Sequence, residues 1–337
     1  MLNYYSLLRQ ILFTLPPERS HHLTLVSLQL LAKTHLWPKQ RTTSASTQLM
    51  GLIFPNRLGL AAGLDKNGDY ITGLAALGFG FIELGTVTPK PQIGNPKPRL
   101  FRLPEADALI NRMGFNNKGI DHLIARLQHC HKPDALIGIN IGKNATTPVA
   151  NAVDDYIIGL QKAYPWADYI TINISSPNTK NLRDLQQGSM LTELLEKLKT
   201  QQKILAEQAQ IYKPLVVKIA PDLNEEELKW LAEQIVRFKI DGVIATNTTV
   251  SRKGVEGLPH DYEQGGLSGR PLMETSTQVL KILRKELGVK FPLIGVGGIM
   301  SAADAAEKIA AGANLLQIYT GLIYRGPKLI KEILKVI

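Results

Sequence analysis

From residue 58 onward, short runs of apolar and β-branched residues alternate with segments of helical periodicity. Each run has the length of one buried strand, and the apolar residues of the segments between them recur every three to four positions. Eight such runs occur, at residues 58–62, 80–85, 135–141, 169–174, 215–219, 242–246, 293–296 and 315–319. The clearest helical segments are residues 192–208, 224–238, 275–286 and 302–311. Eight strand–helix units over about 280 residues predict an α/β fold, a (β/α)8 TIM barrel.

An open, doubly wound sheet is the alternative α/β fold. It predicts a glycine-rich loop after the first strand and an acidic residue about 20 residues later. The segment at the end of the first run, Ala61-Ala62-Gly63-Leu64-Asp65, does not have this pattern. Glycines suited to a phosphate lie instead by the seventh and eighth runs, where barrels place their phosphate sites. The barrel is therefore the favoured fold.

The N-terminal segment has helical periodicity without strand-like runs. One helical stripe consists of Leu7, Leu8, Ile11, Leu12 and Leu15. Pro16-Pro17 interrupts this stripe, and proline at a first helical position suits the start of another helix. A second helix is predicted over residues 19–33, with Trp37-Pro38 after its end and a Ser/Thr-rich linker over 41–48. The barrel is thus expected to carry an N-terminal two-helix extension.

This pattern divides the chain into an extension, residues 1–45, and a barrel, residues 46–337. The extension has one acidic residue, Glu18, and five basic ones: Arg9, Arg19, Lys33, Lys39 and Arg41. Two interpretations remain open at this point. The pair of helices either caps the barrel or rests on a membrane surface and admits an apolar ligand.

The composition excludes several classes of protein. With 44% hydrophobic and 20% charged residues among 337, the chain is neither disordered nor collagen-like. A single cysteine, Cys130, rules out an internal disulfide. The net charge of +10 suits an anionic partner or a solvated basic surface. No apolar run is long enough to span a membrane, and Arg9 and Pro16-Pro17-Glu18 do not fit a signal peptide.

The predicted strand ends, where a barrel places its chemistry, are rich in Asn, Thr, Ser and Lys. Only Asp65 is an acidic candidate, so neither a pair of sugar-cleaving carboxylates nor a carboxylate metal site is expected. No histidine lies at a strand end, so no zinc site is expected either. Side chains of this kind suit a flat, anionic ligand with many heteroatoms.

Two features suggest how an anionic cofactor could be held. Gly297-Gly298, followed by Ser301 and a helix, is a candidate cradle for a phosphate, and Gly269 could add a backbone donor. Lys218 ends an otherwise apolar run. It is either a lysine whose stem packs while its head reaches solvent, or a cation beside a cofactor that gains negative charge on reduction, as a flavin does.

Together these motifs resemble those of the dihydroorotate dehydrogenase family, specifically its membrane-associated, quinone-linked class. The segments that carry the resemblance are residues 61–68, 85–89, 111–117, 173–179 and 295–299, and the match extends over essentially the whole chain. The resemblance implies FMN as cofactor and oxidation of (S)-dihydroorotate to orotate in de novo pyrimidine (UMP) biosynthesis. It also implies a membrane quinone as electron acceptor, a peripheral position on the cytoplasmic face of the cell (inner) membrane, a monomer and no nucleic acid.

The resemblance assigns roles residue by residue. Contacts with FMN are implied for Ala62, Gly63, Lys66, Thr86, Asn140, Asn173, Lys218, Thr246, Gly269, Gly298, Tyr319 and Thr320. Contacts with the substrate are implied for Lys66, Asn111, Arg112, Met113, Gly114, Phe115, Asn173, Asn178, Asn247 and Thr248. Ser176 matches the catalytic base, and the quinone head is expected to contact His21 and Arg102.

Ser176 also indicates the class within the family. The cytosolic class has cysteine at this position, and here the only cysteine, Cys130, lies far away in the chain. Serine is a poor base, so its hydroxyl is expected to relay the proton onward as its own bond forms. The polar loop over residues 178–188 is a candidate lid over this site.

Three alternatives are weighed against this hypothesis. A cytosolic-class dihydroorotate dehydrogenase requires the cysteine base and no helical extension. A tRNA dihydrouridine synthase suits the basic charge but requires an RNA-binding domain and a cysteine acid near the flavin. A barrel that merely binds a phosphorylated ligand at a membrane would have no dihydroorotate chemistry.

Overall fold

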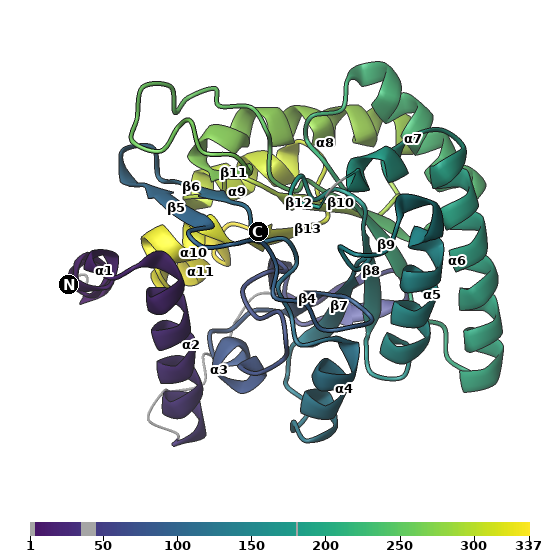
Figure 1. Cartoon of the computed structure of the whole chain (residues 1–337), viewed down its shortest axis with the longest axis horizontal. Coiled ribbons are helices and arrows are strands. Elements are labelled where there is room, and N and C mark those ends of the chain that lie inside the picture. Colours follow the sequence, from purple (N-terminus) through teal and green to yellow (C-terminus); the bar gives the residue numbers. More distant parts are fainter. Residues whose placement is uncertain (1–3, 35–44, 180) are drawn as a thin grey trace.

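The computed structural model describes residues 4–34, 45–179 and 181–337. Eight parallel strands close into a barrel, which confirms the predicted fold (Figure 1). The strands are β3 (Leu58–Leu60), β4 (Phe81–Val87), β7 (Leu136–Ile141), β8 (Tyr169–Asn173), β9 (Leu215–Ile219), β10 (Gly242–Ala245), β12 (Leu293–Val296) and β13 (Leu315–Ile318). Pairing of β13 with β3 closes the ring.

Helices surround the barrel. They are α3 (Ile71–Ala75), α4 (Ile120–Gln128), α5 (Ala152–Ala163), α6 (Gly188–Ala209), α7 (Glu225–Arg237), α8 (Met273–Leu287), α9 (Ala302–Ala310), α10 (Thr320–Arg325) and α11 (Lys328–Ile333). Asn224 caps α7 in a reciprocal capping box with Glu227, and Ser301 caps α9 by accepting from the Asp304 N–H. Asp222, two residues before Asn224, pairs with Arg183.

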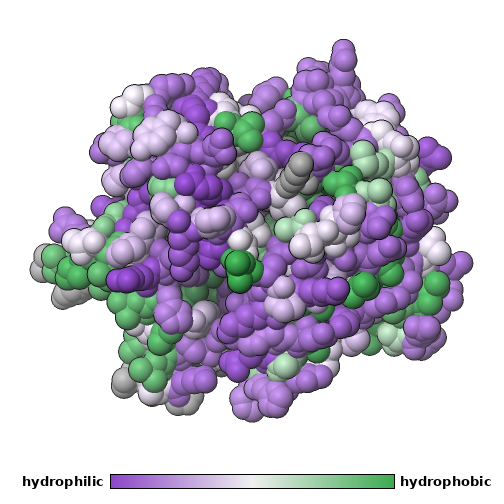
Figure 2. Space-filling model, viewed as in Figure 1, coloured by the Kyte–Doolittle hydropathy of each residue, from purple (hydrophilic) through white to green (hydrophobic). Residues whose placement is uncertain are grey.

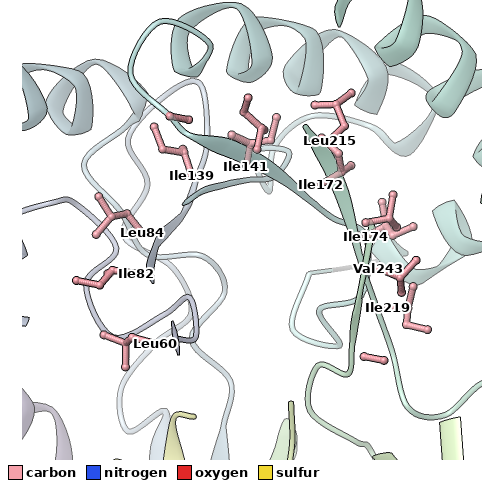
Figure 3. Packing of buried hydrophobic residues seen from close by; sticks show 14 of the residues in the cluster. Leu60, Ile82, Leu84, Ile139, Ile141, Ile172, Ile174, Leu215, Ile219 and Val243 are labelled. Carbon is pink, nitrogen blue, oxygen red and sulfur yellow. The ribbon is translucent and has the colours of Figure 1, made fainter. Parts of the chain in front are cut away.

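Alternation along each strand separates two cores. Outward side chains such as Ile82, Ile139 and Ile172 pack against the helices (Figure 3). The intervening side chains point into the barrel, where Phe81 and Tyr169 form part of an apolar layer. The hairpin of β1 (Thr47–Leu49) and β2 (Leu52–Phe54) closes the lower end of this layer, because Phe54 lies edge to face on Phe81 at 5.3 Å.

The predicted linker over residues 41–48 is wrong at its end, because Thr47 and Gln48 are part of β1 and pair with Phe54 and Ile53. Residues 41–44 and Trp37-Pro38, the predicted end of the second helix, lie outside the described residues. Within the described part, that helix continues to Lys33 and Thr34 follows it.

A three-stranded antiparallel sheet at the strand ends was not predicted. It consists of β5 (Leu100–Leu103), β6 (Ala108–Asn111) and β11 (Gly266–Gly269), in the order β11-β6-β5. The first two strands lie in the connection between β4 and α4, and β11 lies between β10 and α8. The sheet therefore brings Asn111 and Gly269 to the end of the barrel where chemistry is expected.

The N-terminal extension forms α1 (Tyr4–Thr14) and α2 (Pro17–Lys33), which lie beside the barrel (Figure 1). The Gly73 N–H of α3 donates to Gln29 Oε1 of α2 at 2.8 Å. Arg99 forms two hydrogen bonds with the Glu18 carboxylate, at 3.0 and 3.1 Å. Specific polar contacts thus fix α2 against the strand-end face.

Candidate functional site

One cavity of about 810 Å³ opens at the carboxyl ends of the strands. Seven of the eight strands or the loops that follow them line it; β7 does not. The cavity extends to α2, where His21, His22, Leu23 and Val26 line its wall. A polar floor inside the barrel and a partly apolar entrance beside α2 are therefore parts of one space.

Most of the residues named from the sequence meet in this cavity. Those that line it are His21, Ala62, Gly63, Lys66, Thr86, Asn111, Met113, Gly114, Phe115, Asn173, Ser176, Asn178, Lys218, Thr246, Asn247, Thr248, Gly269, Gly298, Tyr319 and Thr320. Asn140, Arg112 and Arg102 are not among the lining residues.

These three side chains have other partners. Asn140 lies below the cavity and accepts from the Thr86 hydroxyl at 2.5 Å. Arg112 donates to Glu263 Oε2 at 2.6 Å, and its guanidinium lies 4.7 Å from the centre of the Phe101 ring. Arg102 donates to the carbonyls of residues 13 and 15 at the end of α1. Their expected roles remain predictions.

Ser176 lies in the loop after β8 and is 6% exposed. The Asn178 N–H donates to its Oγ at 3.2 Å, and Asn178 Nδ2 donates to Asn111 Oδ1 at 3.2 Å. A donated N–H stabilises negative charge that develops on the hydroxyl oxygen. Ser176 and two amide side chains thus face one ligand position.

Lys218 occupies an inward position on β9 and is 5% exposed. Burial lowers the pKa of its ammonium, and the negative charge of Glu83 opposes that shift. Lys218 is therefore a buried cation at the floor of the cavity, where an anion that forms nearby would stabilise its charged state.

Lys66 and His21 both line the cavity and are close enough for their charges to interact. A turn centred on Asp65, whose carboxylate accepts three backbone N–H groups, places Lys66. Burial lowers the pKa of Lys66 to about 8 and, with repulsion from Lys66, lowers that of His21 to about 4. At neutral pH, His21 is therefore an uncharged donor and acceptor.

The predicted phosphate cradle has the geometry that a close backbone approach requires. Gly298 has a φ of +77°, and a Cβ there would lie 2.3 Å from Met273 Cα. Gly297, Gly298, Ile299 and Met300 all line the cavity just before α9 begins. Only glycine fits the second position of this turn without displacing α8.

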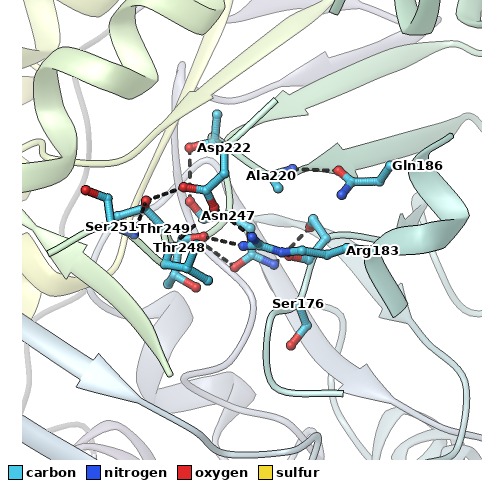
Figure 4. A network of polar contacts seen from close by, with 12 residues as sticks. Ser176, Arg183, Gln186, Ala220, Asp222, Asn247, Thr248, Thr249 and Ser251 are labelled. Carbon is cyan, nitrogen blue, oxygen red and sulfur yellow. Dashed lines mark hydrogen bonds and ion pairs between the residues drawn. The ribbon is translucent and has the colours of Figure 1, made fainter. Parts of the chain in front are cut away.

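Sequence analysis missed a polar network that ties three loops together (Figure 4). Arg183 donates to Asp222 at 2.7 Å, to the Ser175 carbonyl at 3.1 Å and to the Thr248 carbonyl at 3.0 Å. The loop over 178–188 is thereby held to the ends of β9 and β10, although whether it acts as a lid stays a prediction. An arginine in a polar loop was the available signal, but its partner, Asp222, lies 39 residues further along the chain.

The fold and the cavity define a (β/α)8 barrel with a large, partly polar cavity at the carboxyl ends of its strands, the arrangement typical of barrel enzymes. Among the described residues, no helix is long and apolar enough to cross a membrane, and no three His, Cys, Asp or Glu side chains gather as metal ligands.

Comparisons with known proteins narrow this class. The profile of the dihydroorotate dehydrogenase family matches residues 44–337. The chain is 60% identical to the dihydroorotate dehydrogenase (quinone) of Acinetobacter baylyi, over 97% of this chain and 98% of that protein. It is 57% identical to the protein of the same name from Nitrosomonas eutropha, over 98% and 96%. A crystal structure of DHODH from Eimeria tenella in complex with ferulenol is similar with a TM-score of 0.87 and 38% identity, over 95% of this chain and 90% of that one.

The chain therefore belongs to the dihydroorotate dehydrogenase family, in its quinone-dependent class, and is a flavin oxidoreductase. The resemblance drawn from the motifs is confirmed.

Proposed function

We propose that this enzyme oxidises (S)-dihydroorotate to orotate, with FMN as its flavin, and passes the electrons to a membrane quinone in de novo pyrimidine biosynthesis. The observation that carries the proposal is the single cavity joining Ser176 and Lys218 to α2. One end holds the amide and lysine side chains that suit orotate and a flavin. The other end, beside α2, gives an apolar acceptor a way in.

The residues of the floor fit FMN. Gly297 and Gly298 line the cavity just before α9, where their backbone N–H groups would hold the phosphate, and Lys218 would supply a cation beside the reduced flavin. Buried amide and hydroxyl groups of Thr86, Asn173 and Thr246 provide donors and acceptors for a heterocyclic ring. When bound, FMN supplies the acceptor for the hydride.

The chain's own residues supply binding and proton transfer. In this proposal Asn111, Asn178 and Asn247 bind the donors and acceptors of the pyrimidine ring, and Lys66 binds the carboxylate. All four residues line the cavity. Ser176 Oγ takes the proton from the carbon next to the one that loses the hydride, and its own hydroxyl proton passes to a water molecule. Because Ser176 is nearly buried, bulk water has little access to this step.

We further propose a peripheral monomer on the cytoplasmic face of the cell membrane, with residues 1–45 as its membrane element and 46–337 as the catalytic barrel. Figure 2 shows apolar surface gathered at the side where α1 and α2 lie. The exposed apolar side chains of this region are Leu7, Leu8, Ile11, Leu15, Leu23, Val26 and Leu30. Such a surface beside the cavity entrance suits contact with a bilayer.

A purified, yellow protein tests the proposal directly. Anaerobic addition of dihydroorotate is expected to bleach the flavin absorbance and to form one orotate per flavin, and a quinone is then expected to restore the colour. A flavin that dithionite bleaches but dihydroorotate does not would exclude the proposed substrate.

Lys218 carries a separate prediction about the flavin. Lys218→Ala is expected to lower the two-electron midpoint potential by roughly 30–60 mV, the equivalent of one charged hydrogen bond, and to weaken flavin retention. Lys218→Arg keeps the charge and is the matched control. Spectroelectrochemistry gives the potential, and equal potentials in wild type and Lys218→Ala would show that Lys218 is only a packed stem.

A further inference from the structure

Glu83 is a buried carboxylate inside the barrel, on β4, and none of the roles above involves it directly. It is 1% exposed and does not line the cavity. Its Oε1 accepts from Asn140 Nδ2 at 2.7 Å. Its Oε2 accepts from Gln317 Nε2 at 2.8 Å and from the hydroxyls of Tyr169 and Thr171 at 3.2 Å each. Four donors from three other strands therefore converge on one acceptor-only group.

A chain of directed hydrogen bonds leads from Glu83 up to the cavity. Asn140 gives its NH2 to Glu83, so its Oδ1 is left to accept from the Thr86 hydroxyl at 2.5 Å. Thr86 Oγ1 in turn accepts from Asn173 Nδ2 at 2.8 Å. Asn173 Oδ1 is then left to accept from the Ser175 hydroxyl at 3.1 Å.

The last member of this chain of hydrogen bonds is Asn247, which lines the cavity. Ser175 Oγ accepts from Asn247 Nδ2 at 2.9 Å. Asn247 and Asn173 both line the cavity, whereas Glu83, at the other end of the chain, is an acceptor only. Each side chain in this chain of hydrogen bonds is thus oriented by its neighbour on the Glu83 side.

Gln317 is oriented in the same way from the other carboxylate oxygen. The Gln317 NH2 group donates to Glu83, so Gln317 Oε1 points away from Glu83. This Oε1 is buried without a hydrogen-bond partner among the described residues, and Gln317 lines the floor of the cavity. A buried, unpaired acceptor in a binding cavity is suited to an N–H of a ligand.

We infer that Glu83 is a positioning residue: acting through Asn140, it fixes which way the cavity amides of Asn173 and Asn247 point, and it holds Gln317 Oε1 as an acceptor for an N–H of a ligand ring. This role rests on the proposed function, because the oriented amides are those that would bind FMN and orotate. The negative charge of Glu83 also faces Lys218, whose ammonium it stabilises.

Glu83→Gln is the sharpest change, since it keeps the size of the side chain and replaces one acceptor by an NH2 group. That NH2 must face either Asn140 or Gln317, and one of these amides must turn to avoid opposing donors. If the Asn140 amide turns, the hydrogen bonds that lead from it to Asn247 change direction. If the Gln317 amide turns, the cavity loses Oε1 as a hydrogen-bond acceptor. In flavin-loaded protein, the dissociation constant of orotate is expected to rise about tenfold or more.

A second substitution tests orientation against simple packing. In Glu83→Gln combined with Asn140→Asp, the new carboxylate accepts from Gln at 83 and still accepts from Thr86. All the original hydrogen-bond directions are restored, while the negative charge moves from position 83 to position 140. The double variant is expected to recover most of the orotate affinity that Glu83→Gln loses, a recovery that a packing role does not predict.

Thr171→Val, which removes one donor but leaves both amides in place, is expected to lower the unfolding temperature and to change the orotate affinity by less than about twofold.

Orotate binding is measured from the change it causes in the visible spectrum of the flavin. If Glu83→Gln binds orotate as wild type does, or if the double variant is no better than Glu83→Gln, the inference is wrong. If Glu83→Gln is isolated without flavin, flavin content becomes the measurement, and failure of the double variant to regain flavin contradicts the inference. A wild-type spectrum that orotate leaves unchanged would instead contradict the proposed function.

Discussion

Ser176→Ala is expected to leave the flavin bound and to slow its reduction by dihydroorotate by about 10²–10⁴-fold, the range that a positioned general base contributes. The side chain is nearly buried, and among the described residues its one hydrogen bond is with the Asn178 N–H, so its loss leaves the cavity otherwise intact. The barrel itself does not depend on this hydroxyl. Anaerobic stopped-flow spectroscopy of the flavin absorbance measures the rate.

Two controls separate loss of the base from loss of binding. Ser176→Cys keeps a group that can accept and relay a proton, so it is expected to retain part of the rate. Orotate affinity is expected to change only a few-fold in Ser176→Ala, because Asn178 still contacts Asn111. Reduction of the alanine variant at the wild-type rate would remove Ser176 from the role of base.

The strands were predictable because the barrel buries both of their faces. Runs such as 215–219 are nearly continuous in apolar residues, and flanking turns mark their ends. The start of α2 was predictable for a similar local reason, since Pro16-Pro17 interrupts one helical stripe and suits the beginning of another. The local sequence pattern was sufficient to predict elements whose structure depends mainly on their own residues.

The strand-end sheet depends on contacts that no local pattern reveals. β6 pairs with β11 in a register that sets Asn111 opposite Gly266, more than 150 residues away in the chain. The β1–β2 hairpin did leave a signal, because Met50 and Gly51 both have positive φ and glycine at the second position is typical of such two-residue turns. Its Ser/Thr-rich surroundings favoured a linker instead.

The site was predicted through family motifs, and its supporting residues were not. Glu83 stands in the apolar run Phe81–Val87, and a lone acid in a buried strand must find donors. That signal was present, but the donors that Glu83 contacts lie 57 to 234 residues further along the chain. Residues that line the cavity can thus be named by resemblance, whereas the network beneath them requires the three-dimensional arrangement.

Changes in α1 are expected to have the largest effect on liposome binding and on turnover with a membrane quinone, because one side of this helix contacts the barrel and the other is exposed. Tyr5 and Arg9 donate to the carbonyls of residues 323 and 324 at 2.7 Å each, and the Phe13 ring lies edge to face on that of Tyr324 at 5.5 Å. Leu7, Leu8 and Ile11 on the other side are 62%, 49% and 59% exposed. The first side anchors the helix to the barrel, and the second is free to enter a bilayer.

Removal of residues 1–40 is a blunt test of this arrangement. It leaves Arg99, whose side chain is 8% exposed, without the Glu18 carboxylate, and it uncovers the surface of α3 beneath Gln29. The truncated protein is expected to keep reduction of the flavin by dihydroorotate and to lose turnover with long-chain quinone, but exposed apolar surface would favour aggregation. A subtler change leaves these contacts in place.

Combined replacement of Leu7, Leu8 and Ile11 by serine keeps the anchors of α1 and removes only its exposed apolar side chains. Each such side chain contributes about 1.5–3 kcal/mol when buried, so liposome binding is expected to weaken by more than about 100-fold. Turnover with a long-chain quinone in liposomes is expected to fall with it, while flavin reduction by dihydroorotate and reoxidation by a water-soluble quinone stay near wild type. Serine at three exposed apolar positions on the barrel, Ile211, Val236 and Val289, is the matched control and is expected to leave liposome binding unchanged. Equal sedimentation of the α1 variant and wild type with anionic liposomes, together with equal long-chain turnover, would show that α1 only caps the barrel.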